Sequence, residues 1–229
     1  MENIGIIVAC KEEMNALLES SSKNITYSQI ESIPFNVYKF NINGKTAYVG
    51  LSQIGEIASS ALTQYLITRF NVTSIINFGV CGSLLDNLNV KHVVFIDKIV
   101  DSSFDTSFID KCAKSVHPEL GYNIPQMEVN NSLTEIVFSQ FPQIKRVTCV
   151  CSNVFVDSNQ KKDSLAKTYS ASICEMESAG IFLTAKRNNV PCLFIKAVSD
   201  SKNGGNNEYT KMITDASKVA IDVLLNILK

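Results

Sequence analysis

The sequence is short of histidine and of net charge, and each shortage argues against a class of function. Lysine and arginine together number 21 against 22 acids, which gives a net charge of −1 for 229 residues. This balance argues against a nucleic acid or an anionic membrane as a partner held by bulk charge. The two histidines, His92 and His117, fit neither H-E-x-x-H nor H-x-H spacing, so we expect no metal site.

Long hydrophobic runs are also missing. The longest uncharged apolar runs, such as residues 4–10, have the length of a strand and are far too short to cross a bilayer. Glu2 and the acids that follow Cys10 do not fit a signal peptide. The expected location is therefore cytoplasmic, with no membrane partner.

Cysteines at metal-binding or redox spacing are missing as well. No C-x-x-C occurs, and the seven cysteines are an odd number scattered along the chain: Cys10, Cys81, Cys112, Cys149, Cys151, Cys174 and Cys192. We interpret them as buried free thiols in a reducing compartment.

The sequence does contain an alternation of strand-like and helix-like segments. Residues 4–9 form a continuous apolar run typical of a covered strand, and a helical pattern follows at Met14, Leu17 and Leu18. Asn43-Gly44 lies between two apolar runs and predicts a hairpin. A helix is predicted for residues 56–70, with a buried stripe of Ile57, Ala58, Ala61, Leu62, Tyr65 and Leu66.

The same alternation continues to the end of the chain. Further strands are expected at 74–78, 90–100, 147–150 and 192–197, and further helices at 133–141, 178–187 and 208–228. Residues 101–127 lose the pattern and predict an excursion over the surface. Together these segments predict a single α/β domain over residues 1–229, a three-layer α/β/α sandwich with a mixed central sheet.

Acidic residues gather at the ends of the late strands. Glu175 and Glu177 precede the helix at 178–187, and the strand at 192–197 leads to Ser199 and Asp200. Polar groups at the carboxyl ends of strands converge on the ligand crevice of an open α/β sheet, so we expect these acids to share one pocket. The glycines of G-V-C-G at 79–82, read as a turn after a strand, would let backbone N–H groups approach a ligand.

Six segments together resemble the nucleoside phosphorylase/hydrolase superfamily, and most of all its 5′-methylthioadenosine/S-adenosylhomocysteine nucleosidases. They occur in the order and spacing of that family from end to end: GIIVACKEEM at 5–14, SQIGEIASSA at 52–61, NFGVCGSL at 77–84, CSNVFVDS at 151–158, CEMESAG at 174–180 and KAVSDSK at 196–202. The resemblance implies hydrolysis of an adenine N-glycosidic bond, a reaction of methionine salvage, without cofactor or metal.

The resemblance also implies roles for individual residues. Asp200 would protonate the leaving purine, and Glu13 would help to activate water, with Glu12 as the alternative. Glu177 would hold the ribose 2′- and 3′-hydroxyls, with Met176 under the sugar. The remaining binding residues that it implies are Cys10, Ile54, Val80, Phe155, Val156, Lys196, Ser199 and Tyr209.

The proposed chemistry requires these residue types in its own right. Bond cleavage leaves a cationic sugar, which nearby carboxylates stabilise. The purine departs poorly as an anion, so it needs a placed acid, and burial among apolar walls would raise the pKa of Asp200 enough for that role. A carboxylate such as Glu177 accepts from two hydroxyls and suits a diol.

Several positions depart from the family pattern. Asn77 and Val80 stand where phosphate-using relatives have an arginine and a hydroxyl residue, which favours hydrolysis over phosphorolysis. Val80 also replaces a serine usual in the nucleosidases. Asn153-Val154 loses an acid, and Lys196 stands where arginine is common.

Two alternatives stay open at the level of the sequence. One is a purine nucleoside phosphorylase or a hydrolase of another nucleoside, and the other is a non-catalytic protein that binds or stores nucleosides. The resemblance further implies a homodimer in which the excursion around Phe104 and Phe108 of one protomer covers the 5′ pocket of the other.

Overall fold

The computed structural model describes residues 3–20, 25–111 and 113–229. Its strands are β1 (Asn3–Val8), β2 (Ile25–Glu31), β3 (Asn36–Ile42), β4 (Lys45–Leu51), β5 (Ser74–Ser83), β6 (Val93–Asp101), β7 (Met127–Glu128), β8 (Lys145–Cys151), β9 (Ile173–Glu175) and β10 (Cys192–Asp200). Its helices are α1 (Lys11–Glu19), α2 (Glu56–Phe70), α3 (Ser107–Asp110), α4 (Ser132–Gln140), α5 (Asn159–Tyr169), α6 (Ser178–Arg187) and α7 (Asn206–Ile227), with a 3₁₀ turn at Pro118–Leu120.

The strands form one mixed ten-stranded sheet, as the alternation predicted. β1 pairs in parallel with β4 and β5, and β5 pairs in parallel with β10. We expected an open sheet, but part of this sheet closes into a ring. β10 pairs with β6, β6 with β8, β8 with β9, and β9 with β5. This closure brings the ends of β5, β9 and β10 around one point.

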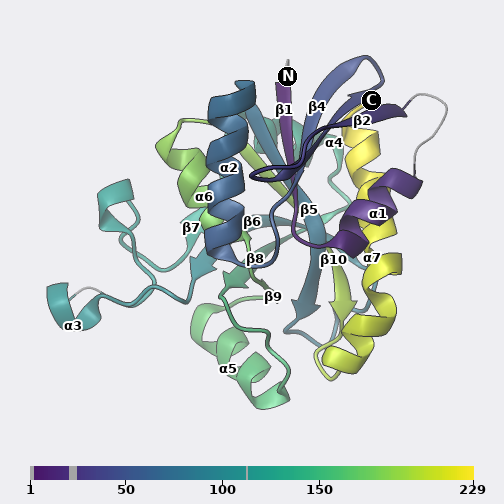
Figure 1. Ribbon diagram of the computed structural model, residues 1–229. Coiled ribbons are helices and arrows are strands. Elements are labelled where there is room, and N and C mark those ends of the chain that lie inside the picture. Colours follow the sequence, from purple (N-terminus) through teal and green to yellow (C-terminus); the bar gives the residue numbers. More distant parts are fainter. Residues whose placement is uncertain (1–2, 21–24, 112) are drawn as a thin grey trace.

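Helices cover the sheet on both faces and make three layers. Figure 1 shows α2 and α6 on one side of the strands and α1 and α7 on the other. Each side has its own apolar cluster, one built on α1, α4 and α7 and the other on α2 and α6. The covered strands β1 and β10 are buried along nearly their whole length, which explains their continuous apolar runs.

Two strands differ from what the sequence predicted. The glycines at 79–82 do not form a turn, because β5 runs on to Ser83 and pairs with β10 throughout this stretch. β2 was not predicted, since its residues are mostly polar and exposed. Within the described ranges it is an edge strand whose one neighbour is β3, so few of its side chains need to be apolar. The hairpin at Asn43-Gly44 is confirmed, with both residues at positive φ as a two-residue turn requires.

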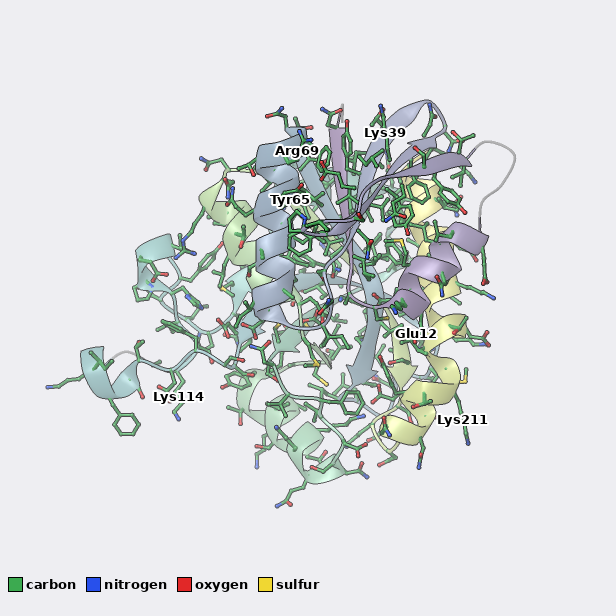
Figure 2. All side chains as sticks on the ribbon, in the orientation of Figure 1. Glu12, Lys39, Tyr65, Arg69, Lys114 and Lys211 are labelled. Atoms are coloured by element: carbon green, nitrogen blue, oxygen red, sulfur yellow. The ribbon has the colours of Figure 1, made fainter. Side chains whose placement is uncertain are left out.

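The buried stripe of α2 is also corrected. Leu62 and Leu66 are fully buried, but Ile57 is 84% exposed and Ala61 is exposed. The helix turns Ser59 and Thr63 inward instead, where their hydroxyls bond to backbone carbonyls. Figure 2 shows Tyr65 and Arg69 farther along this helix. Both side chains donate hydrogen bonds to the carboxylate of Glu31, and these bonds connect β2 to α2.

Five cysteines are buried and Cys10 is half-buried, and these six are free thiols, while Cys112 lies outside the described residues. Within the described ranges, no helix has both the length and the apolarity needed to cross a membrane. The same ranges hold no cluster of three or more residues suited to a metal ion.

Candidate active site

A cavity of about 300 Å³ opens at the carboxyl ends of β1, β5, β9 and β10. Eleven of the twelve predicted site residues line it: Cys10, Glu13, Ile54, Val80, Phe155, Val156, Met176, Glu177, Ser199, Asp200 and Tyr209. The twelfth, Lys196, is buried behind Glu175 and Glu177 and is not among the lining residues. The volume is at the lower end of the range of small-molecule sites.

Asp200 is the last residue of β10 and is 2% exposed. Its Oδ2 accepts from Lys162 Nζ at 2.6 Å, and its Oδ1 accepts from Ser199 Oγ at 3.0 Å. Burial raises the pKa of Asp200, and the Lys162 ammonium opposes that rise. The carboxyl fits closely against β5, because a Cβ on Gly82 would lie 3.0 Å from Oδ2.

Glu13 comes from the first turn of α1, yet it points into the molecule and is 3% exposed. Its Oε2 accepts from the N–H of Ala9 at 2.8 Å, and its Oε1 accepts from the N–H of Val80 at 3.1 Å. Burial raises its pKa, with Lys196 opposing. Gly79 leaves room for this carboxylate, because an added Cβ would overlap Oε1. The alternative acid, Glu12, is exposed on α1 (Figure 2).

Glu175 and Glu177 lie on either side of Met176 at the junction of β9 and α6 but differ in environment. Glu175 accepts from Ser178 Oγ at 2.6 Å and from two backbone N–H groups, and it pairs with Lys196 at 3.0 Å. Burial acts to raise its pKa, but Lys196 and Ser178 outweigh it and hold the pKa below its ordinary range. Glu177 has fewer partners, namely the N–H of Gly55 at 3.1 Å and Lys196 at 3.8 Å, so burial raises its pKa.

Lys196 is the common counter-ion of these acids. It is 1% exposed on β10, where its ammonium faces Glu175, Glu177 and Glu13. Burial acts to lower its pKa, and the three carboxylates together raise it above its ordinary value. One buried cation therefore balances part of the negative charge of the site from behind the cavity wall.

Apolar groups form the mouth of the cavity. Phe155 and Tyr209 meet edge to face, with ring centroids 5.4 Å apart, and Phe155 is 40% exposed. Ile54 also lines the cavity and is 54% exposed. A planar, partly apolar ligand would find a stacking surface here and its polar partners deeper inside.

The family is decided by comparison with known proteins. A family model described as the phosphorylase superfamily matches residues 3–229. The chain belongs to the phosphorylase superfamily.

Its relatives in that superfamily are nucleosidases. Aminodeoxyfutalosine nucleosidase of Helicobacter pylori is 29% identical over 212 residues, covering 88% of this chain and 86% of the relative. The 5′-methylthioadenosine/S-adenosylhomocysteine nucleosidase of Staphylococcus aureus is 31% identical over 211 residues, covering 88% and 87%. The resemblance predicted from the sequence is thereby confirmed, and the chain belongs with the nucleosidases, which are N-glycosyl hydrolases.

The fold is shared with solved structures as well. The 5′-methylthioadenosine/S-adenosylhomocysteine nucleosidase of Helicobacter pylori, solved as a complex, superposes with a TM-score of 0.89 at 23% identity, covering 99% of this chain and 97% of that one. Futalosine hydrolase of the same organism gives 0.88 at 23% identity. The α/β fold with a mixed sheet is thus confirmed.

The positions where this superfamily member departs from its family pattern have structural roles of their own. Asn77 is fully buried in β5 and donates to the carbonyl of Ile7 at 3.0 Å, away from the cavity. Val80 offers its N–H to Glu13. Asn153 accepts from the N–H of Glu56 at 2.9 Å and so satisfies the start of α2. Among the described residues that line the cavity there is no lysine or arginine.

Sequence reasoning missed Lys162 of α5. Residues 157–167 are polar enough in sequence to predict an exposed loop and short helix, whereas Lys162 is 1% exposed. A signal was present: Leu165, Ala166 and Tyr169 lie three, four and seven residues later and pack on one apolar cluster, so Lys162 occupies the same helical stripe. A lysine on an apolar stripe is unusual enough to mark a buried ion pair.

Proposed function

We propose that this protein hydrolyses the N-glycosidic bond of 5′-methylthioadenosine or S-adenosylhomocysteine and releases adenine. The observation that carries the proposal is that three buried acids from distant parts of the chain, Glu13, Glu177 and Asp200, line one cavity. The Staphylococcus aureus relative named for these substrates supports the choice of substrate.

In the proposed reaction Asp200 gives its proton to the departing purine. The C–N bond electrons leave with the base, and the proton prevents the base from departing as an anion. A placed general acid supplies a factor of about 10² to 10⁴ in rate. Burial of Asp200 favours the protonated form that this role requires.

The other two acids act on the sugar and the water. Cleavage leaves positive charge on the ribose, and the carboxylates around the cavity stabilise it. Glu177 accepts hydrogen bonds from the ribose hydroxyls, with Met176 under the ring. Glu13 takes a proton from the attacking water, which adds its oxygen to the sugar carbon that the base has left.

Hydrolysis is favoured over phosphorolysis by the charge of the cavity. A phosphate ion needs charge-assisted donors, and the cavity residues described contain no lysine or arginine. Lys196 is already engaged by Glu175 and Glu177. Water therefore remains as the acceptor of the sugar.

The test is adenine release from 5′-methylthioadenosine with and without inorganic phosphate, followed by chromatography of the sugar. We expect adenine and free methylthioribose in both conditions. A sugar 1-phosphate formed only with phosphate would replace the proposal with a phosphorylase. Ligand-induced stabilisation without any product would replace it with a nucleoside-binding protein.

A second substrate is favoured by a specific observation. The Helicobacter pylori relative is named for aminodeoxyfutalosine and matches 88% of this chain. We therefore propose that the same assay be run with aminodeoxyfutalosine in parallel. Comparison of the two kcat/KM values then decides which 5′-substituent the mouth around Ile54 and Tyr209 accepts.

We propose that the enzyme is a single-domain cytoplasmic homodimer. The matched superfamily region spans nearly the whole chain, which supports one domain, and the free thiols suit the reducing cytoplasm. Phe108 and Ile109 on the excursion are 94% and 87% exposed, and Ile57 is 84% exposed. These apolar side chains support a homodimer in which a second copy covers the region beside the cavity mouth.

A further inference from the structure

A buried lysine that the reaction above does not use lies against the acid that it depends on. Lys162 Nζ donates to Asp200 Oδ2 at 2.6 Å and to the carbonyl of Ser201 at 2.7 Å. Both members of the ion pair are nearly inaccessible, at 1% and 2% exposure. The lysine reaches the acid from α5, and it is not among the residues that line the cavity.

Stability alone does not account for this lysine. The cost of removing two charges from water offsets most of the attraction within a buried ion pair, and an apolar residue of similar size is often as stable. The stripe of α5 that holds Lys162 is otherwise apolar, with Leu165 and Ala166 packed against the apolar cluster that includes Val100 and Val150. A methionine at position 162 would fit that apolar pattern, so stability does not explain why a charged side chain stands there.

The other charged groups around the pair are engaged elsewhere or face solvent. Glu208 of α7 accepts from the N–H and the hydroxyl of Ser201. Lys202 pairs with Asp163 and Asp86. Cys174 of β9 is a buried thiol near both members of the pair, and Lys161 is exposed on α5. Lys162 is thus the cation in contact with Asp200 in the described chain.

We propose that Lys162 is a positioning residue for the leaving-group acid: its ammonium holds the Asp200 carboxyl in place and stabilises the carboxylate that proton transfer leaves behind. The inference rests on the proposed function, because it gives Lys162 a role only if Asp200 protonates a leaving purine.

The proton transfer balances without any further reactant. The O–H bond of protonated Asp200 breaks as a new N–H bond forms on the purine, and the purine keeps the electrons of the broken C–N bond. Asp200 becomes a carboxylate, and Lys162 remains an ammonium, so a neutral acid beside a cation becomes a closed ion pair. Burial favours the acid before transfer, and Lys162 favours the anion after it.

The test compares Lys162→Met, Lys162→Arg and the matched control Lys161→Met, an exposed lysine of the same helix. We expect Lys162→Met to lower kcat for adenine release about ten- to a hundredfold, a part of what a general acid supplies. Without the cation the pKa of Asp200 rises, so the alkaline limb of the kcat/KM profile moves to higher pH. We expect Lys162→Arg to have the alkaline limb of the parent protein, and we expect Lys161→Met to change neither kcat nor the pH profile.

An unchanged kcat and an unchanged pH profile in Lys162→Met would overturn the inference. Should that variant not fold, as judged by circular dichroism, Lys162→Gln keeps a donor without the charge and carries the same comparison. In an Asp200→Asn background we expect Lys162→Met to cause no further loss of kcat, because the group it assists is gone; a full additive loss would overturn it. Absence of adenine release by the parent protein would instead remove the proposed function itself.

Discussion

The acids around the cavity differ in the hydrogen bonds and ion pairs that their carboxylates make, although the sequence alone does not distinguish them. Glu175 accepts from Ser178 Oγ and from the backbone N–H groups of Glu177 and Ser178, and it pairs with Lys196, so it is fully engaged in the wall. Glu177 and Asp200 have fewer partners, and burial raises the pKa of each. At the scale of the residue, the number of partners therefore separates the carboxylate held in the wall from those that we expect to take part in the reaction.

The position of the Glu13 carboxylate depends on the absence of a side chain at Gly79. The carboxylate lies over Gly79, where a side chain would collide with it. We expect Gly79→Ala to displace Glu13 and to lower kcat for adenine release by about a hundredfold, since a small misplacement of a reacting group has that effect. The fold should persist, because the colliding atoms are the movable end of a side chain.

Gly5→Ala is the matched control for that variant. Its Cβ would lie 2.7 Å from Ile75 Cδ1 in the core of the sheet, away from the cavity. We expect a loss of about 1 to 3 kcal/mol in the free energy of unfolding and an unchanged kcat. Urea unfolding measures the free energy of unfolding of both variants, and steady-state kinetics measures their kcat. An equal loss of kcat in the two would mean that Gly79 matters only for packing.

At the scale of the element, the start of α2 joins three parts of the chain. Glu56 is its first residue, and its Oε1 accepts from Ser103 Oγ of the excursion at 3.0 Å. Asn153, which follows β8, accepts from the Glu56 N–H. Burial, with the charge of Asp101 adding to it, raises the pKa of Glu56 to about 7. An acid that is costly to ionise thus lies at the junction.

The pH dependence of stability follows from the direction of that shift. The folded protein holds the Glu56 proton up to a pH of about 7, whereas the unfolded chain releases it near the ordinary value of 4.5. Rising pH therefore favours unfolding between these values. We expect the parent to lose about 1 to 2 kcal/mol relative to Glu56→Gln between pH 4.5 and 7, allowing for partial solvent screening.

Urea midpoints at pH 4.5, 6 and 8 measure this difference. Glu135→Gln is the control, because Glu135 is an exposed acid in the first turn of α4. Its midpoint should follow that of the parent at every pH. A parent that gains stability relative to Glu56→Gln over the same range would show that ionised Glu56 is stabilised by the helix N-terminus, against the burial argument.

Several elements could be predicted from the sequence because one local signal dominates them. The apolar runs of β1 and β10 reflect burial on both faces, and Asn43-Gly44 reflects a turn that needs positive φ. Other elements follow from contacts between distant segments. β5 continues through its glycines because β10 pairs alongside, and Lys162 is buried because Asp200 meets it from 38 residues away. No local pattern contains such partners.

At the scale of the whole molecule, the closure of the sheet is the feature that makes the site. Periodicity predicts strands but not their neighbours, so the ring of β10, β6, β8, β9 and β5 had no signal in the sequence. This ring places the ends of three strands around one cavity. Glu177, Ser199 and Asp200 were expected from the carboxyl ends of strands, and the other nine site residues came from the resemblance, which carries information on the tertiary arrangement that local patterns lack. The cavity brings eleven of the twelve site residues together, while their roles stay predictions.

The exposed apolar surface argues for a partner at the same scale. Figure 1 shows the excursion with α3 extending from the body of the molecule, and Figure 2 shows Lys114 on it. Lys114 Nζ pairs with Asp105 at 2.8 Å. Phe108 and Ile109 of α3 are almost fully exposed, as is Ile57 on α2. A segment that carries such side chains away from its own core is typical of an interface with another copy.

We expect the parent to sediment as a dimer and Ile57→Asp combined with Phe108→Asp to sediment as a monomer, because two buried charges at an apolar interface have no partners. Adenine release should fall mainly through a higher KM, since the partner's excursion would cover the 5′ side of the cavity. Ile136→Asp is the control, an exposed isoleucine on α4 that is 56% accessible, and it should remain dimeric and active. Sedimentation velocity and kinetics on the same samples test both parts. A monomeric parent with full activity would contradict the proposed dimer and leave the cavity complete within one chain.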